Sequence, residues 1–402
     1  MPSAAAVLSE PRFAFFGAEA RSDPTVAAPA APAWPIAILG VPFDPVTLAA
    51  AVDRVAAMVD AGRPHYVVTP NVDFLVQARR DAELHRILVQ ADLILCDGRP
   101  LVWASRWLGN PLPGRVAGSD LVPVLLQRSA ARGWKIFLLG GAAGVGAAAA
   151  RRIAATYPSL PAVAHYSPPH RPLAEMNHAE IVARVRAAQP DIVLVCFGCP
   201  KQEKWIFRHY RTVGAPVMIG AGGTVDFLAG RLKRAPQWMR RIGAECLFRL
   251  WQEPRRLAKR YAGDLANFAP ALGAQLWHLP ARMGKAHAPS SFPCSATMAY
   301  GIKVQAAEGL HRDVLQGAPQ FWADAVAHPG HCLIDLAQVE SIDSTGLAFL
   351  LHWQRSLARA RRNLILLRPS AAVRSALDRM RLTGQFVITD GPGGNSPPNG
   401  ER

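Results

Sequence analysis

Cysteine is scarce in this sequence, and its placement argues against disulfides and structural zinc. The chain has 402 residues and six cysteines. The cysteines are Cys96, Cys196, Cys199, Cys246, Cys294 and Cys332. One close pair stands in the run CFGC, but no second pair follows at the spacing of a zinc site. Most of the others lie in apolar runs, where a free cysteine behaves as a small hydrophobic residue, so we expect a reducing cytoplasm.

Long hydrophobic runs are also missing. No run approaches the roughly 18 apolar residues that a membrane-spanning helix needs, so any membrane contact should be peripheral. Residues 1–35 are rich in Ala and Pro and lack the basic start and apolar core of a signal peptide. We therefore expect a flexible leader at 1–35 and a protein that stays on the side of the membrane where it was made.

Acidic residues are few relative to basic ones. The chain has 29 Asp and Glu against 45 Lys and Arg, a formal charge of +16. Such an excess implies an acidic partner, which can be nucleic acid, anionic lipid or a phosphorylated substrate. Residues 231–260 hold ten basic and two acidic residues among apolar ones. This pattern predicts a basic helical appendage at 231–278, and we favour a membrane and a diphosphate over nucleic acid because no nucleic-acid-binding motif accompanies the charge.

The spacing within this appendage predicts one basic helical face. Arg249, Arg256 and Arg260 share that face if the helix accommodates Pro254. The apolar residues between them can meet apolar surface or lipid. They are Leu247, Leu250, Trp251 and Leu257.

Half of the residues are apolar, and the length favours two domains with ordinary cores. From residue 36 to about 217, short apolar runs alternate with amphipathic stretches, which is typical of a parallel sheet covered on both faces. We predict a Rossmann-like α/β domain at 36–278, including the appendage. A Pro- and Ser-rich linker at 279–296, a small α/β domain at 297–392 and a disordered tail at 393–402 should follow.

Several polar or Gly-rich clusters fall where predicted strands end, which is where parallel sheets bind ligands. Gly140 and Gly141 lie between a strand and an Ala-rich helix. They can allow a nucleotide phosphate to approach the backbone, or they can be needed only for the tight turn. Asp97 follows an apolar strand, where a general base is wanted. The other polar residues at strand ends can also be helix caps or surface residues. They are Thr69, Asn71, Asp73, Gln202, Glu203 and Asp226.

Eight motifs between residues 36 and 261 carry a specific resemblance. They are TPN, CDGRP, GRVAGSDL, FLLGG, FGCPKQEKW, GAGGTVDFLAG, RAPQWM and FRLWQEPRRLAKRY. In this order they resemble the WecG/TagA/CpsF family of bacterial glycosyltransferases. The resemblance implies inverting, metal-independent transfer of an N-acetylmannosamine-type sugar from a UDP-sugar to a polyisoprenyl diphosphate-linked acceptor. It places the enzyme at the inner face of the plasma membrane in cell-surface polysaccharide synthesis, without a cofactor, and makes a homo-oligomer a candidate.

The same resemblance assigns roles to residues. It implies that Asp97 is the base, that Thr69 belongs with it in a catalytic loop, and that Gln202 is a later catalytic position. The implied substrate-binding residues are Asn71, Gly140, Gly141, Arg115, Asp226, Arg249 and Arg256. The two last arginines lie in the appendage, which is thought to close over the active site at the membrane. One departure is Gly114, which stands where many members have an acidic residue, and it puts donor or acceptor preference in doubt.

The C-terminal region reads as strand, turn, helix, strand, helix from about residue 297. The run IDSTG precedes an amphipathic helix, and Ser344 or Thr345 can be a simple N-cap there. The segment also resembles STAS domains of the anti-sigma-factor-antagonist type, and this resemblance makes Ser344 a candidate phosphoacceptor. A STAS-binding protein or kinase is then a further candidate partner, and the module can equally be a scaffold whose phosphosite is unused.

Two classes of function follow from these patterns. The first is a glycosyltransferase that a STAS module regulates or docks. The second is a non-catalytic regulator that senses a sugar nucleotide and acts through STAS. The residues at 69, 97 and 202 favour the enzyme. A dinucleotide oxidoreductase is disfavoured, because no acidic ribose-binding residue is evident about 20 positions after the Gly-rich turn.

Overall fold

The computed structural model describes residues 33–236, 239, 245–279, 294–298, 301–306 and 309–390. The chain divides into two compact units. The larger unit is Val41–Trp277, and the smaller unit combines Met1–Gly40 with His278–Arg402. The sequence pattern placed residues 36–40 at the start of the larger domain, whereas the structure assigns them to the smaller unit.

A six-stranded parallel sheet forms the centre of the larger unit, in the order β4-β3-β8-β7-β5-β6. Its strands are β3 (His65–Val68), β4 (Leu93–Ile94), β5 (Ile136–Gly140), β6 (Ala164–Tyr166), β7 (Ile192–Cys196) and β8 (Val217–Gly220). A short strand, β2 (Val41–Phe43), precedes them. The predicted Rossmann-like parallel sheet is confirmed, and all carboxyl ends of its strands lie at one edge.

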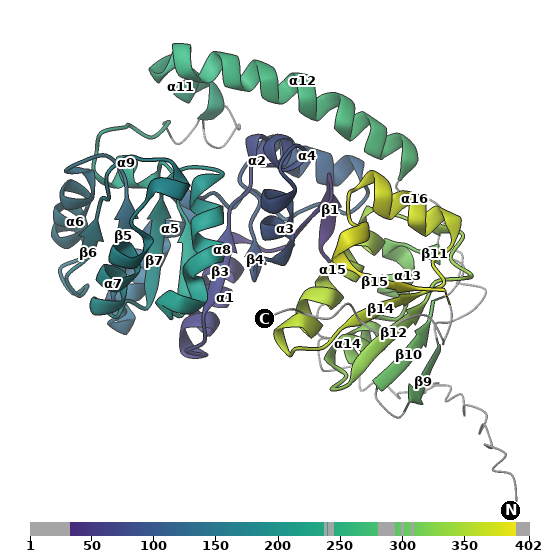
Figure 1. The fold of residues 1–402 in the computed structure, drawn as a ribbon. Helices are drawn as coiled ribbons and strands as arrows, with labels where there is room; N and C mark the ends of the chain where they lie inside the picture. The colour runs from purple at the N-terminus through teal and green to yellow at the C-terminus, as the bar shows by residue number, and fades with distance from the viewer. Residues whose placement is uncertain are drawn as a thin grey trace, which may run out of the picture. The chain divides into compact units, whose positions relative to one another are not determined.

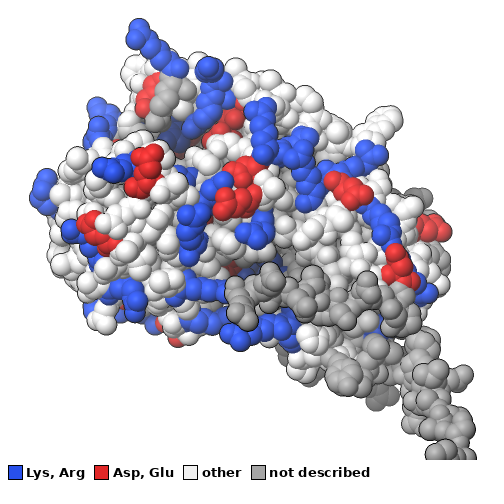
Figure 2. Space-filling model, viewed as in Figure 1, with Lys and Arg blue, Asp and Glu red and all other residues white. Residues whose placement is uncertain are grey.

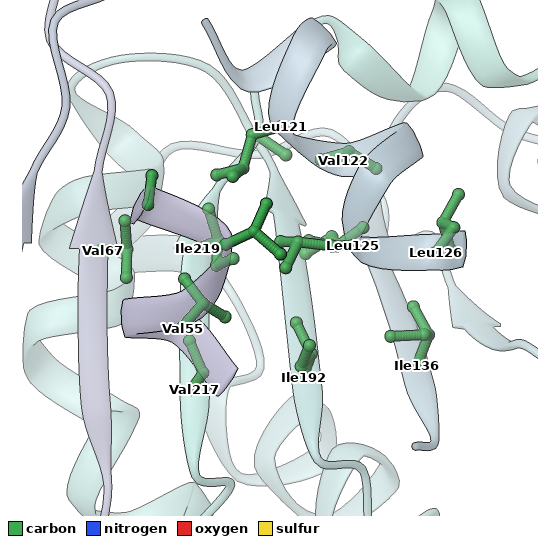
Figure 3. Close-up of a cluster of buried hydrophobic side chains, with 14 of the residues drawn as sticks. Val55, Val67, Leu121, Val122, Leu125, Leu126, Ile136, Ile192, Val217 and Ile219 are labelled. Atoms are coloured by element: carbon green, nitrogen blue, oxygen red, sulfur yellow. The ribbon is translucent and has the colours of Figure 1, made fainter. Parts of the chain in front are cut away.

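Helices cover both faces of this sheet (Figure 1). They are α1 (Leu48–Asp60), α2 (Val72–Ala78), α3 (Ala82–Gln90), α4 (Arg99–Trp107), α5 (Gly118–Arg132), α6 (Val145–Thr156), the 3-10 turn η1 (Leu173–Glu175), α7 (His178–Ala187), α8 (Lys201–Val213) and α9 (Thr224–Leu228). On one face, Val55 of α1 and Leu121 of α5 pack on Val67 and Ile219 of the strands (Figure 3). The neighbouring Tyr66 points the other way, as strand alternation requires, and its ring meets Tyr210 of α8.

Residues 245–278, the described helical part of the basic appendage, form two helices instead of the single helix that a shared face of arginines would need. They are α11 (Glu245–Gln252) and α12 (Pro254–His278). Proline has no N–H and its ring clashes with the carbonyl four residues earlier, so Pro254 begins a new helix, and the condition for a shared basic face, one helix that continues through Pro254, is not met. Leu257 is fully buried, whereas Leu247 and Trp251 are 60% and 78% exposed. Arg80, at the end of α2, holds α12 through a 2.6 Å hydrogen bond to Asn267.

The smaller unit is built on a five-stranded sheet in the order β15-β14-β12-β10-β9, in which only the β10–β9 pair is antiparallel. Its strands are β9 (Cys294–Met298), β10 (Gly301–Gln305), β12 (His331–Asp335), β14 (Leu364–Leu367) and β15 (Val387–Thr389), with β11 (Gly309–Leu310) and β13 (Ser341–Ile342) paired separately. Its helices are α13 (Arg312–Gly317), α14 (Pro319–Ala327), α15 (Ser344–Arg359), α16 (Ala371–Arg379) and the 3-10 turn η2 (Thr383–Gln385). The predicted small α/β domain is confirmed. Strand β9 begins inside the expected linker.

The N-terminal segment of the smaller unit packs on α15. Strand β1 (Ile36–Ile38) is fully buried and contacts this helix. Trp34 is 7% exposed, and its ring meets Phe349 edge-on with the centroids 5.1 Å apart. An aromatic pair of this kind contributes about 0.5–1.5 kcal/mol beyond its buried area. The last residues of the expected leader are therefore part of the core of the smaller unit.

The excess positive charge is spread widely over the face in Figure 2, with acidic side chains between the basic ones. The appendage is therefore one contributor to the charge among several. Of the helices in the described part of the chain, none is both long enough and apolar enough to span a bilayer.

Candidate active site

Asp97 lies at the carboxyl edge of the sheet, in a loop fixed by its backbone. After β4 the chain continues through Leu95 and Cys96, which are both buried. The side chain of Asp97, the next residue, is partly exposed. The N–H of Asp97 donates to the carbonyl of Pro70, after β3, at 3.0 Å. The N–H of Val116 donates to the carbonyl of Cys96 at 2.8 Å. These bonds fix the backbone of the loop that carries Asp97 at the carboxyl edge of the sheet, which is the position that the sequence predicted.

The surroundings of Asp97 shift its titration toward neutrality. Burial raises the pKa of Asp97 from 3.8 to about 6, and the nearby carboxylates Glu245 and Asp120 act in the same direction. The guanidinium groups of Arg115 and Arg249 oppose this rise and favour the ionised form. A carboxylate with a pKa just below neutral is ionised at pH 7 and still basic enough to accept a proton.

An ion-pair network next to Asp97 fixes the start of α11. Arg115 contacts both Asp120 and Glu245 at 2.6 Å, and it is 18% exposed. Arg234 pairs with the other oxygen of Asp120. A guanidinium that two carboxylates already hold has less capacity for a substrate, so Arg115 contributes here by anchoring Glu245 on α11. The sequence did not single out Asp120, Arg234 or Glu245, although Asp120 stands within the GRVAGSDL motif.

Arg249 projects from α11 toward the loop that follows β8. Its guanidinium lies 5.5 Å from the ring centre of Phe227. Its Nη2 would be 3.7 Å from a Cβ at Gly223. Arg249 therefore reaches the carboxyl edge of the sheet that also carries Asp97, and a substrate contact for it stays a prediction. The side chain of Arg256, the other predicted appendage arginine, lies outside the described part of the structure.

Thr69 and Asn71 follow β3 and have structural partners. The hydroxyl of Thr69 donates to the carbonyl of Gly220 at 3.2 Å. Asn71 is the N-cap of α2, and its Oδ1 accepts the N–H of Phe74 at 3.3 Å. The capping interpretation of Asn71 is confirmed. Asn71 still borders the loop of Asp97, because a Cβ at Gly98 would be 4.0 Å from the Cβ of Asn71, and a Cβ at Gly118 would be 3.7 Å from Oγ1 of Thr69.

Gln202 is buried and links two strand-end loops. Its Oε1 accepts the N–H groups of Gly198, after β7, and Gly222, after β8, each at 3.1 Å. Its Nε2 donates to Glu203 at 2.7 Å. Both side chains are 1% exposed, and burial raises the pKa of Glu203 to about 7. The alternative that Gln202 and Glu203 are surface residues is thus excluded, and in the structure Gln202 joins the loops after β7 and β8.

The turn after β5 needs its glycines for backbone reasons. Gly140 has φ 105°, and a Cβ there would lie 2.8 Å from the carbonyl oxygen of Cys196. Gly141 has φ 80°, and a Cβ there would lie 3.2 Å from Val225. The tight-turn interpretation therefore has direct support, and a nucleotide contact at this turn stays a prediction.

Asp226 lies on α9, after β8, with one oxygen 3.8 Å from Arg231. Its position at the carboxyl edge agrees with the sequence prediction, and a substrate role stays a prediction. Across the described residues, no three His, Cys, Asp or Glu side chains are grouped so that they could hold a metal ion.

Ser344 belongs to the smaller unit and is fully buried at the first position of α15. Asp343 is the N-cap of this helix, and its Oδ1 accepts the N–H groups of Thr345 at 2.9 Å and Gly346 at 2.8 Å. The alternative that Ser344 or Thr345 caps the helix is therefore wrong. The carboxylate of Asp343 reaches two N–H groups and also that of Arg312 at 3.1 Å.

Comparison with known proteins identifies the families of both units. Residues 36–282 match the model of the glycosyl transferase WecG/TagA/CpsF family, and residues 314–389 match the model "Mlab, STAS domain". Two similar proteins, from Staphylococcus aureus strains MRSA252 and MW2, are named N-acetylglucosaminyldiphosphoundecaprenol N-acetyl-beta-D-mannosaminyltransferase. They are 31% and 30% identical over 224 residues, which is 55% of this chain and 86% of each relative. The chain belongs to the WecG/TagA/CpsF family of glycosyltransferases, with a STAS domain in its smaller unit.

Proposed function

We propose that the larger unit transfers an N-acetylmannosamine-type sugar, with inversion, from a UDP-sugar to a polyisoprenyl diphosphate-linked acceptor. The relatives' names specify an N-acetylmannosaminyl group and an N-acetylglucosaminyl-diphosphoundecaprenol acceptor. The observation that carries the proposal is the partly buried Asp97 at the carboxyl edge of the sheet, whose pKa burial raises to about 6 while the nearby Arg115 and Arg249 favour its ionised form. We place this activity in cell-surface polysaccharide synthesis.

Asp97 supplies the base in this proposal. Its ionised carboxylate accepts the proton of the acceptor hydroxyl as that oxygen bonds to the anomeric carbon from the face opposite to UDP. The bond between the anomeric carbon and the diphosphate oxygen breaks in the same step. The carboxylate becomes neutral, and UDP leaves with the electron pair.

Positive groups at the same edge are suited to the charge that develops on UDP. Arg249 is on α11 and approaches Gly223, so it can contact a diphosphate bound over the loop after β8. The turn at Gly140 and Gly141 leads into α6, whose first N–H groups face the same edge. Charge-assisted hydrogen bonds from such donors are stronger than neutral ones and act where the transition state gains charge.

A lipid-linked acceptor places this reaction at a membrane surface. The exposed Leu247 and Trp251 lie on the helix that carries Arg249, so one element can meet lipid on one side and the diphosphate on the other. We propose peripheral attachment at the inner face of the plasma membrane. The STAS domain would regulate or dock the transferase by binding another protein.

UDP release by the purified full-length chain tests this function. UDP-N-acetylmannosamine with a polyisoprenyl diphosphate-linked N-acetylglucosamine should give UDP and a disaccharide with inverted anomeric configuration. Other UDP-sugars at equal concentration are the matched controls for donor choice. No UDP release with any donor would favour the non-catalytic regulator instead.

A further inference from the structure

Helix α4 presents an exposed aromatic face one turn beyond the candidate base. Trp103 and Trp107 are 45% and 59% exposed. Residues four apart are neighbours on a helix surface, so the two indole rings form one patch. The opposite side of α4 is buried through Leu101, Val102 and Ala104. The helix is therefore firmly seated, and its tryptophans point away from the core of the larger unit.

The charged residues of α4 itself are all basic. Arg99 and Arg106 lie on the same side of α4 as the tryptophans, at the spacing of successive turns. Between Gly98 and Ser119 the sequence has no acidic residue. Tryptophan and arginine together on a short helix are typical of elements that lie in the headgroup region of a membrane, where the indole is half in the apolar layer and the guanidinium meets phosphate.

We propose that α4 is a membrane-inserting element, with Trp103 and Trp107 as its anchors in an anionic bilayer. The inference rests on the proposed function, because it explains how the enzyme reaches an acceptor whose diphosphate lies at the bilayer surface. Helix α4 begins two residues after Asp97. Insertion of the tryptophans therefore fixes the height of the base above the lipid.

A bilayer fits this face better than a second copy of the chain. A self-complementary interface would bring Arg99 and Arg106 against the same arginines, or near them, with no carboxylate on α4 to offset their charge. Anionic headgroups supply that charge directly. The exposed Leu247 and Trp251 also lie on α11, whose first residue, Glu245, is bound to Arg115 beside the site. Each of the two helices that carry these exposed apolar pairs thus has a link to Asp97: α4 begins two residues after it, and Glu245 and Arg249 of α11 act on its pKa.

The test compares full-length wild-type protein with Trp103→Ala/Trp107→Ala on vesicles of phosphatidylglycerol and phosphatidylcholine. Removing two partly inserted indoles should weaken vesicle binding at least about tenfold, given roughly 25 cal/mol per Å² of apolar surface. Turnover on a water-soluble acceptor analogue should stay at the wild-type level, while turnover on lipid-linked acceptor in vesicles should fall. Trp277→Ala is the matched control, since Trp277 is 82% exposed at the far end of α12, and it should bind like the wild type.

A second variant keeps the aromatic surface of α4 and shows whether its two tryptophans are the ones that enter the bilayer. Trp103→Phe/Trp107→Phe should still bind vesicles but should lose part of the tryptophan quenching by brominated lipids. Unchanged vesicle binding by the alanine variant would overturn the proposal. An alanine variant that no longer self-associates but still binds vesicles like the wild type would also overturn it. If the wild type binds vesicles through α4 but releases no UDP, the proposed function fails while the membrane element stands.

Discussion

The ionised form of Asp97 is the one that can accept a proton in the transfer reaction. Burial makes this same form less favourable in the folded protein. Its folded-state pKa of about 6 is above the ordinary 3.8, chiefly because of burial. The folded state therefore holds this proton more tightly than the unfolded state, and the free energy of unfolding falls as pH rises from about 4 to about 6. Transfer by an ionised base should increase over the same interval. Activity and stability are thus expected to change in opposite directions with pH.

Replacing Asp97 with asparagine should separate these two effects. The transfer rate should fall by roughly 10²–10⁴, because the proton acceptor is lost. The free energy of unfolding at pH 7.5 should rise by about 1–3 kcal/mol, because a carboxylate is no longer held in a partly buried site. UDP release and chemical denaturation measure the two quantities, and donor binding should be nearly unchanged. Wild-type turnover by this variant would remove Asp97 from the mechanism.

Gln202→Ala should act mainly through stability. The substitution leaves the N–H groups of Gly198 and Gly222 and the buried Glu203 without the partner they have now, so the free energy of unfolding should fall by about 2–5 kcal/mol. Gln127→Ala, on the exposed side of α5, is the control and should stay within about 0.5 kcal/mol of the wild type. If Gln202→Ala keeps wild-type stability but loses turnover, Gln202 is catalytic and does not act as a brace.

The residues that the sequence could identify are those whose position depends on local signals. A polar residue in the segment that follows an apolar strand lies near the edge of a parallel sheet, and this signal placed Asp97, Asn71 and Asp226 near that edge. The Arg115–Glu245 pair joins residues 130 positions apart, and no local pattern indicates such a contact. The burial of Gln202 depends on glycine loops from two different strands, which is again a tertiary feature.

Among the elements, α11 is the one that brings a distant charge to the site. Arg249 lowers the pKa of Asp97, while Glu245 raises it. The sequence predicted the helix and its basic residues from composition and spacing. It also allowed one helix continuing through Pro254, and the structure instead ends one helix at Gln252 and begins the next at Pro254.

Arg249→Ala should move the acid limb of the pH–rate profile to higher pH. The guanidinium now favours the ionised form of Asp97, and its removal should raise that pKa above about 6. Turnover at pH 7 should also fall, because the developing diphosphate charge loses a donor. Arg249→Lys keeps the charge and should keep the limb near its wild-type position. The same limb in Arg249→Ala and wild type would mean that this residue does not act on the base.

In the whole molecule, the candidate phosphosite and the candidate active site belong to different units. Ser344 lies in the smaller unit, with no exposed surface, at the start of α15. A kinase needs an accessible hydroxyl, so phosphorylation would require this helix to open. The sequence could identify the turn and the helix, but it gave no indication that neighbouring elements would bury the serine.

Ser344→Asp should therefore lower the thermal stability of the smaller unit and leave turnover on a soluble acceptor analogue unchanged. The larger, charged side chain has to enter a site that now holds a buried hydroxyl. Ser375→Asp, on the exposed side of α16, is the control and should melt with the wild type in calorimetry. A Ser344→Asp protein that is as stable as the wild type and captures a different partner would restore the phosphoswitch.

The packing of Trp34 on Phe349 has a consequence for synthesis of the chain. These rings are more than 300 residues apart in sequence, and the complete larger unit lies between them. At a translation rate of roughly 5–20 residues per second, strand β1 leaves the ribosome tens of seconds before α15 exists to cover it. Its apolar side chains are then open to chaperones, while Val41–Trp277 can already fold. The larger unit should fold first, and the STAS domain should fold last, when it packs around strand β1, which was synthesised before the larger unit.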